Sequence, residues 1–418
     1  MEKVKFKDLL KQGKISLSDN IVHIQKTQEL EFIDIEFDNF QFKDNQIIYD
    51  GEIIEYNSIE TLNSNKNKLI FRNCNFLRKS EFINENIILS KNFVFDNCSF
   101  NELSFFNIKN QKDDLYSISF KSSYFNKLII ENSKFSGKFY IQSEEAKKIT
   151  FLKIKDSVFN SNFKLHNIEI NDIEINNVDF EKNADFFKSK FLQLDKNICF
   201  KGINFNGLSL FGECKFSSKV IFEYVTFKGL SHFREAIFIN GLNLDKANIE
   251  KEMNFFGSIG LENSKNISQE TYRIIKYNCQ KIGNQIEANK YFSLELEKRK
   301  DFLKEHWKSN FFDFLVFQMN WITSKFSRSW FRPLIGIFLV SFFTVLFLHI
   351  DNVAHLQNII FNFSESHLNK LFDEFFKYVS ITSFDELKNK PWLFVFNKLM
   401  LGYLYYQFII AVRKDTIK

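Results

Sequence analysis

The stretch FEYVTFKGLSHFREAIFINGLNLDKANIEKEMNFF, residues 222–256, has large apolar residues at a spacing that fits neither a helix nor a strand. The residues concerned are Phe222, Phe227, Phe233, Phe238, Leu244, Ile249 and Phe255. Successive members are five or six residues apart in alternation, so the pattern repeats every eleven residues. An amphipathic helix repeats at three and four residues, and a half-buried strand alternates at two. A fixed longer period indicates a repeat architecture, in which each unit buries its apolar face against its neighbours.

The same spacing extends towards the N-terminus through Phe205, Phe211 and Phe216, and shorter runs at a step of five or six begin near residue 71. One of these runs has a pure step of five from Leu115 to Tyr140. The phase slips near residues 140–149 and 191–200, which predicts a loop at each place.

A second position also repeats. In the units FRNCNF (71–76), FGECKF (211–216) and FREAIF (233–238), a compact residue stands two places before the closing phenylalanine. These compact residues are Cys74, Cys214 and Ala236, and most intervening positions are polar. One face of each unit therefore carries a large and a small residue, and the rest is solvated. The best-defined predicted repeat core consists of Phe205, Phe211, Phe216, Phe222, Phe227, Phe233, Phe238, Leu244, Ile249 and Phe255.

With these units, the chain resembles the pentapeptide-repeat proteins over roughly residues 60–260. The resemblance implies a β-solenoid, a right-handed quadrilateral β-helix with one five-residue unit on each side and four units in each coil. We assign it to residues 61–262. A ring of four large side chains would fill each coil, and stacked coils would complete the core.

Residues 1–60 are expected to form an N-terminal cap over the first open edge, because ELEFIDIEFDNFQF alternates in a strand-like way. No apolar region follows MEKVKFKDLLKQ, so no cleaved signal peptide is predicted. Cys74, Cys98 and Cys214 occupy the compact repeat position, and Cys199 and Cys279 lack metal-ligand spacing. Reduced structural cysteines are the main interpretation, and a disulfide or metal role is the alternative.

Residues 263–309 change to helical spacing, broken at Gly283 and Asn284. QETYRIIKYNCQKIGNQIEANKYFSLELEKRK resembles the helical hairpin that follows the repeats in a membrane-associated branch of the family. We interpret it as a C-terminal cap, with a partner-binding hairpin as the alternative. NFFDFLVFQMNWI is too short to cross a bilayer, so an interfacial helix is predicted at 310–323.

Two transmembrane helices are predicted at 331–350 and 392–412. Twenty residues at 1.5 Å each span about 30 Å, the thickness of a bilayer core. The second stretch contains Lys398, which either snorkels to the nearer interface or serves as a functional intramembrane charge. Lys325, Arg328 and Arg332 precede the first span, and Arg413, Lys414 and Lys418 follow the second.

By the positive-inside rule, both termini and the repeat domain face the cytoplasm. The connection at 351–390 is then an extracytoplasmic amphipathic segment, and 413–418 is a cytoplasmic tail. The segments FSRSWFRP and YYQFIIAVRK again resemble the membrane-associated branch, which implies a multi-pass protein of a bacterial cytoplasmic (inner) membrane.

Three functional classes can be weighed. Soluble members of the family that mimic DNA need a strongly acidic rod, but residues 1–265 carry 36 Lys and Arg against 37 Asp and Glu. No nucleic-acid partner is therefore expected. The seven histidines are scattered, and neither HExxH, GxSxG nor a phosphate-binding glycine loop occurs. No catalytic residue, cofactor or metal site is predicted.

The segment FFKYVSITSFDEL, 375–387, lies where two-helix channels have a pore helix and filter. A potassium filter needs a glycine-containing run of carbonyls, and no glycine occurs between Gly336 and Gly402. A degenerate channel-like homo-oligomer with a regulatory repeat domain is thus the alternative, with Thr382, Ser383, Asp385 and Lys398 as residues to test. The main prediction is a non-enzymatic scaffold that is anchored in a lipid bilayer and binds a protein partner.

Overall fold

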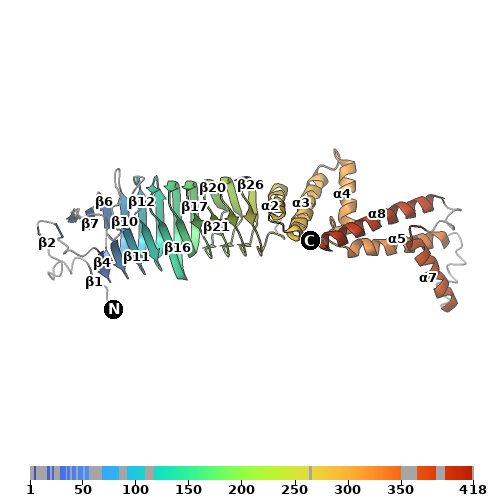
Figure 1. Cartoon of the computed structure of the whole chain (residues 1–418), viewed down its shortest axis with the longest axis horizontal. Coiled ribbons are helices and arrows are strands. Elements are labelled where there is room, and N and C mark those ends of the chain that lie inside the picture. Colours follow the sequence, from blue (N-terminus) through green and yellow to red (C-terminus); the bar gives the residue numbers. More distant parts are fainter. Residues whose placement is uncertain are drawn as a thin grey trace. The chain divides into compact units, whose positions relative to one another are not determined.

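The computed structural model describes residues 68–83, 92–108, 117–262, 266–349, 365–382 and 391–416, together with short strands before residue 60. The chain divides into two compact units, Met1–Ile282 and Gly283–Lys418. The first unit is a β-solenoid followed by one helix, and the second unit is helical. Figure 1 shows the strands of the first unit stacked in chain order.

The strands before residue 60 are β1 (Val4–Lys5), β2 (Leu17–Ser18), β3 (Ile21–Val22), β4 (Glu29–Ile33), β5 (Ile35–Phe37), β6 (Phe40–Lys43), β7 (Gln46–Tyr49) and β8 (Glu52–Glu55). The next strands are β9 (Lys68–Arg72), β10 (Asn75–Ile83), β11 (Asn92–Asp96), β12 (Ser99–Phe106), β13 (Ile118–Lys121), β14 (Tyr124–Glu131), β15 (Lys134–Phe135), β16 (Phe139–Phe159), β17 (Phe163–Phe180) and β18 (Ala184–Asp185). The last are β19 (Lys190–Phe191), β20 (Ile198–Phe205), β21 (Ser209–Leu210), β22 (Lys215–Phe216), β23 (Val220–Phe227), β24 (Ser231–His232), β25 (Ile237–Phe238), β26 (Leu242–Ile249) and β27 (Met253–Asn254).

Each solenoid strand pairs in parallel with the strand one turn away, which brings equivalent residues into register. In the last turns, β20 pairs with β23 so that Phe205 faces Phe227, and β22 pairs with β25 so that Phe216 faces Phe238. The ring centroids of these two pairs are both 5.2 Å apart, close to the distance between neighbouring strands. Each turn here takes 22 residues with four inward side chains, which explains the alternation of five and six.

Within a turn the phenylalanine rings meet edge to face. The Phe95 and Phe100 centroids are 5.3 Å apart with an interplanar angle of 77°, whereas Phe95 stacks at 10° on Phe120 of the next turn. Both geometries are favourable for the aromatic quadrupole. The interior is therefore filled by short stacks of rings, continued by aliphatic residues such as Ile130 and Ile149, and the rings also contact one another within a turn.

Left-handed backbone turns the chain at two corners. One corner column includes Asn73 and Asn97, and the other includes Asn107, Asn132 and Asn177, all with φ between 49° and 54°. Asparagine tolerates this conformation better than most residues with a Cβ. The frequent asparagines of the repeat units are thus explained by backbone geometry.

The compact position supports the same turns. Ser123 Oγ accepts a hydrogen bond from Cys98 N at 3.2 Å, and Ser157 Oγ accepts one from Ser133 N at 3.2 Å. None of the five cysteines forms a disulfide, and desolvation by burial raises the pKa of the Cys98 and Cys214 thiols. A thiol that resists ionisation is a poor nucleophile, so these two residues serve packing.

One of the two predicted loops is wrong. The chain runs as one continuous strand, β16, through residues 140–149, and the phase slip is a register shift between Gln142 and Lys147 in its pairing with β17. Phe139 and Ile141 are buried there, whereas Tyr140, which the step of five places inside, is only half-buried. The second predicted loop is confirmed, because no strand lies between Phe191 and Ile198.

The N-terminal strands β4, β5 and β6 pair in parallel with β9 and β10. Phe37 is buried and stacks on Phe76 at 5.0 Å. Strands β6, β7 and β8 form antiparallel pairs. The parallel pairing thus begins before residue 61, the boundary expected from the sequence.

Helix α2 (Gln269–Lys281) covers the last strands of the solenoid. Thr271 Oγ1 accepts a hydrogen bond from Leu244 N at 2.9 Å, and Asn278 Oδ1 accepts one from Met253 N at 2.8 Å. The edge of a parallel sheet exposes such N–H groups, and here two buried side chains satisfy them. Ser268 Oγ caps the helix by accepting from Thr271 N at 3.0 Å.

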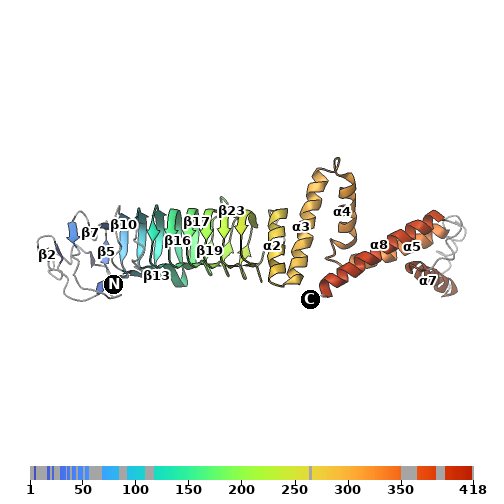
Figure 2. The ribbon, with the colours of Figure 1, turned by 45° about the horizontal axis from the view of Figure 1, so that its top comes forward.

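The second unit contains α3 (Gln285–Glu305), α4 (Phe311–Ser324), α5 (Phe331–His349), α7 (Glu365–Val379) and α8 (Pro391–Thr416). Two of these helices contain stretches long and apolar enough to cross a membrane, Phe331–Leu348 and Pro391–Lys414. Both views show α5 and α8 side by side (Figures 1 and 2). A Cβ on Gly336 would lie 2.9 Å from Leu404 Cδ2, so the absence of a side chain allows this close approach.

Candidate functional site

The outer surface of the solenoid contains a hollow. It lies where the turns containing β18, β21 and β24 follow one another, and β21 pairs with both of its neighbours. Its volume is about 470 Å³. The lining residues are Asp185, Phe187, Leu210, Gly212, Glu213, His232, Arg234 and Glu235.

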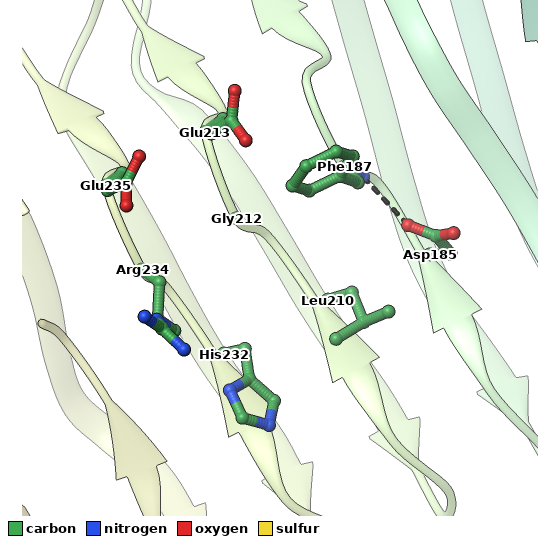
Figure 3. Close-up of a pocket in the computed structure, with 8 residues that line it drawn as sticks. All are labelled: Asp185, Phe187, Leu210, Gly212, Glu213, His232, Arg234 and Glu235. Atoms are coloured by element: carbon green, nitrogen blue, oxygen red, sulfur yellow. Dashed lines mark hydrogen bonds between the residues drawn. The ribbon is translucent and has the colours of Figure 1, made fainter.

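The hollow exists because a glycine interrupts a column of large outward side chains. Phe187, Gly212, Arg234 and Phe256 each follow the inward phenylalanine of their turn. Lys188 N donates to Gly212 O at 3.0 Å and Glu213 N donates to Arg234 O at 2.9 Å, which confirms the alignment of these turns. Figure 3 shows Phe187 and Arg234 on either side of Gly212.

Two neighbouring columns complete the walls. Asp185, Leu210 and His232 stand one above another through the pairing of β18, β21 and β24. Glu213 and Glu235 occupy equivalent left-handed corners, with φ of 54° and 58°, and point outward in adjacent turns (Figure 3). Asp185 also fixes Phe187, because its Oδ1 accepts from Phe187 N at 3.0 Å.

Carboxylates dominate the charge of the hollow. Three carboxylates and one guanidinium line it. The guanidinium, of Arg234, lies 5.5 Å from the centre of the Phe256 ring, which is not among the lining residues. Glu213 Oε2 is 3.6 Å from Lys188 Nζ, an exposed and weak pair. Glu235 has no ion pair with any residue that the structure describes. Desolvation, and secondarily Arg234, lowers the pKa of His232 below its usual value, which favours the neutral ring.

This arrangement can hold a long cationic side chain. Phe187 and Leu210 offer apolar surface to an alkyl stem, and Glu213 and Glu235 can accept hydrogen bonds from an ammonium or guanidinium. Among the residues that the structure describes, no group of three or more His, Cys, Asp and Glu could hold a metal ion.

The predicted repeat-core residues lie inside the solenoid. Nine of the ten are buried, and the exception is Ile249, which is half-buried. Ile249 lines a smaller hollow under α2, together with Ala247 and Ile274. Its turn is the last before the helix, so no further turn of strands stacks on it.

Lys398 lies within the second candidate span, on α8, and binds the end of α7. Its Nζ donates to Ser380 O at 2.9 Å. Tyr405 OH donates to Val379 O at 3.1 Å, and Ser341 Oγ donates to Tyr378 O at 3.2 Å. Both α5 and α8 thus supply donors to the last carbonyls of α7, which have no partner within that helix.

Thr382 lies just beyond this point. Its side chain is exposed, and its N–H donates to Ser380 Oγ at 3.2 Å. The other two predicted residues of this segment, Ser383 and Asp385, lie outside the described residues. The structure therefore brings Lys398 and Thr382 to the same end of α7, with Ser380 between them.

Sequence reasoning missed two features. Gly212 was not recognised as the origin of the hollow, although aligning FGECKF with FREAIF places it beside Arg234. Asn397 was also missed. It is completely buried between α5 and α8, its Nδ2 donates to Thr344 Oγ1 at 2.9 Å, and its Oδ1 accepts no hydrogen bond from the residues that the structure describes.

Comparison with known proteins agrees with the repeat register. Residues 200–248 match the family model described as pentapeptide repeats (9 copies). No curated protein and no solved structure matches the chain. The matched residues include Gly212, Glu213, His232, Arg234 and Glu235, so the hollow is built largely on this segment.

Proposed function

The chain is a pentapeptide-repeat protein, and from this premise we propose that it is a membrane-anchored, non-enzymatic scaffold that captures a protein partner through its β-solenoid. The observation that carries the proposal is the hollow at Gly212. An uninterrupted column of side chains would leave no recess, whereas the missing side chain creates a defined place on an otherwise repetitive surface.

The chemistry of the hollow selects the partner. We propose that a lysine or arginine side chain of the partner enters beside Phe187 and ends at Glu213 and Glu235. Arg234 is held on Phe256, so it can repel acidic segments without filling the recess. An opposite charge on the partner also increases the rate of encounter.

The second unit supplies the anchor in this proposal. Helices α5 and α8 would cross a bacterial cytoplasmic (inner) membrane, with 351–390 on the outer side and residues 413–418 as a cytoplasmic tail. Lys325 and Arg328 before α5, Arg332 in its first turn, and Arg413 and Lys414 at the end of α8 support a cytoplasmic location for both ends. The solenoid, its N-terminal strands and α2 would then face the cytoplasm.

Differential capture tests the scaffold. The full-length protein, its Gly212→Phe variant and its Glu250→Gln variant would be used to isolate bound proteins from solubilised membranes. Gly212→Phe fills the hollow, whereas Glu250 is an exposed carboxylate outside it. We expect a partner that is retained by the parent and by Glu250→Gln but lost at least tenfold with Gly212→Phe. Identical sets of captured proteins would contradict the proposal.

The end of α7 favours one second candidate, a channel-like homo-oligomer. Ser341, which donates to Tyr378 O, lies near the middle of α5, so α7 would end about halfway through the bilayer. The C-terminal end of a helix carries partial negative charge, which favours a cation. Here the ammonium of Lys398 occupies that place.

This second candidate makes a separate electrical prediction. If the protein forms pores, Lys398 acts as a built-in cation that hinders permeant cations, and Lys398→Met should raise the conductance in reconstituted bilayers at least severalfold. Thr382→Ala, at an exposed side chain, and changes at Ser383 and Asp385 would then alter selectivity. An absence of conductance in both the parent and Lys398→Met would remove the channel candidate and leave the scaffold.

A further inference from the structure

Two cations meet at one tryptophan near the start of the first candidate span. The Nζ atom of Lys300, on α3, lies 3.9 Å from the centre of the Trp321 ring, on α4. The guanidinium carbon of Arg332, on α5, lies 5.7 Å from the same centre. Arg332 Nη1 also donates to Trp321 O at 3.3 Å. Three helices of the second unit thus converge on this ring.

The positive charge at this place is only weakly compensated within the described part of the chain. The carboxylate nearest to Lys300 belongs to Asp301, whose Oδ1 is 3.9 Å from Nζ, beyond hydrogen-bonding distance. The Lys300 side chain is only 14% exposed. Arg332 forms no ion pair with a described residue, whereas the nearby Arg328 has Glu297 at 4.0 Å. Two like charges on one ring, with the Lys300 charge largely removed from solvent, favour an external anion.

The surroundings favour a lipid as the source of that anion. Arg332 is the second residue of α5, so it would lie at the membrane interface if α5 crosses the bilayer. Helix α4 exposes Phe312, Val316 and Ile322, at 79%, 61% and 55% of their surfaces. This exposed apolar surface belongs to the same compact unit as the candidate spans. Acyl chains beside these residues would bring a headgroup phosphate to the ring.

We propose that Lys300, Trp321 and Arg332 form a binding site for the phosphate of an anionic phospholipid. The inference rests on the proposed insertion of α5 and α8 into a membrane. The guanidinium can donate two parallel hydrogen bonds to phosphate oxygens, and the ammonium supplies a point charge. Trp321 holds both cations by cation–π attraction and occupies the interfacial level that tryptophan prefers. A zwitterionic headgroup would bring its own positive charge to the pair and bind more weakly.

Fluorescence quenching in vesicles tests the site. The full-length protein would carry Trp307→Phe, Trp330→Phe and Trp392→Phe, which leaves Trp321 as its single tryptophan. It would be reconstituted into phosphatidylcholine vesicles that contain a fixed small fraction of chain-brominated phosphatidylglycerol or, in the second arm, of chain-brominated phosphatidylcholine. We expect at least twofold stronger quenching by the anionic lipid, and equal quenching by both lipids in a Lys300→Gln, Arg332→Gln variant. Lys308→Gln, at an exposed lysine of the α3–α4 turn, is the matched control and should retain the difference.

The outcomes separate this inference from the proposed function. Equal quenching by the two lipids in the parent would overturn the lipid site while leaving membrane insertion intact. A protein that fails to float with vesicles of either composition would instead overturn the insertion on which the site rests. Inorganic phosphate added to the vesicles distinguishes a general anion site. If it abolishes the twofold difference at millimolar concentration, the assignment to a lipid headgroup is wrong.

Discussion

In the solenoid an inward side chain has an equivalent one turn later, often another phenylalanine, whereas in the helical unit each contact between α5, α7 and α8 occurs once. Phe186, Phe211 and Phe233 stack on one another at centroid distances of 4.7 and 4.9 Å, and the column continues to Phe255 in the next turn. The clusters between the helices are small, for example Ile337 with Leu401 and Leu404. Because each turn repeats the same packing, the inward residues of the solenoid can be predicted from the spacing of the sequence. The contacts of the helical unit are not repeated, so no sequence period predicts them.

The two regions also treat polar groups differently. In the solenoid, buried serines such as Ser133 and Ser157 satisfy backbone N–H groups at equivalent positions of successive turns. In the helical unit, Ser341, Lys398 and Tyr405 satisfy three successive carbonyls at one place. The first arrangement builds length, and the second fixes the end of one helix.

The largest effect is expected from breaking one column of rings. Phe227→Asp buries a carboxylate at a fully buried position, between Phe205 and the last strands. Removing a buried phenylalanine costs about 3–5 kcal/mol, and an unpaired charge adds to this cost. Denaturant unfolding, followed by circular dichroism of the strand signal, should show a loss of at least 4 kcal/mol (order of magnitude).

Lys228→Asp is the control for this change, because Lys228 is the exposed next residue. It should shift stability by less than about 0.5 kcal/mol, as surface substitutions usually do. Equal stability of the two variants would mean that the inward register assigned to the repeats is wrong.

A smaller effect is expected where α5 and α8 meet. Gly336→Leu places side-chain atoms where a Cβ alone would already be 2.9 Å from Leu404 Cδ2. Overpacking of this kind costs about 1–3 kcal/mol. Gly402→Leu, on α8, provides a matched control because nothing lies within 4 Å of a Cβ there. Unfolding of the full-length protein in detergent should show a lower free energy of unfolding for Gly336→Leu only. Similar losses of stability in both variants would argue against the close packing of these helices.

How far the sequence could predict these regions follows from the same difference. The spacing of Phe205 to Phe255 indicates which side chains point inward, because each turn repeats the constraint. It could not show that Gly212 creates a hollow, since that depends on which turns are neighbours. Hydropathy places Lys398 in a predicted span. The sequence does not identify its acceptor, Ser380 O, because that contact occurs once and follows no repeat. The change of phase near residue 142 predicts a loop wrongly, because a register shift within a strand and a loop interrupt the sequence period in the same way.

A still smaller effect, in the opposite direction, is expected at Asn397. Its amide oxygen is buried and has no hydrogen-bond partner in the described part of the chain, and leaving a polar atom unsatisfied costs free energy. Asn397→Leu removes that atom, while Thr344 Oγ1 keeps its hydrogen bond to Val340 O at 2.8 Å. The variant should therefore be as stable as the parent or more stable by up to about 1 kcal/mol in detergent unfolding. A clear loss of stability would indicate that the orphaned oxygen has a partner in the folded protein, such as a second subunit.

The smallest effect concerns the pH dependence of the solenoid at His232. Desolvation and Arg234 lower the pKa of His232 in the folded state, so the unfolded chain binds a proton more readily. Stability should then be unaffected above the ordinary histidine pKa near 6.5 and should fall as the pH drops from there towards the lowered value. His232→Gln should flatten this part of the profile, because glutamine cannot be protonated. His306→Gln, at an exposed histidine of the helical unit, is the control and should leave the profile of the solenoid unchanged. A parent whose solenoid gains stability on acidification from pH 6.5 would show that Glu213 and Glu235 attract the His232 proton more strongly than burial and Arg234 oppose it.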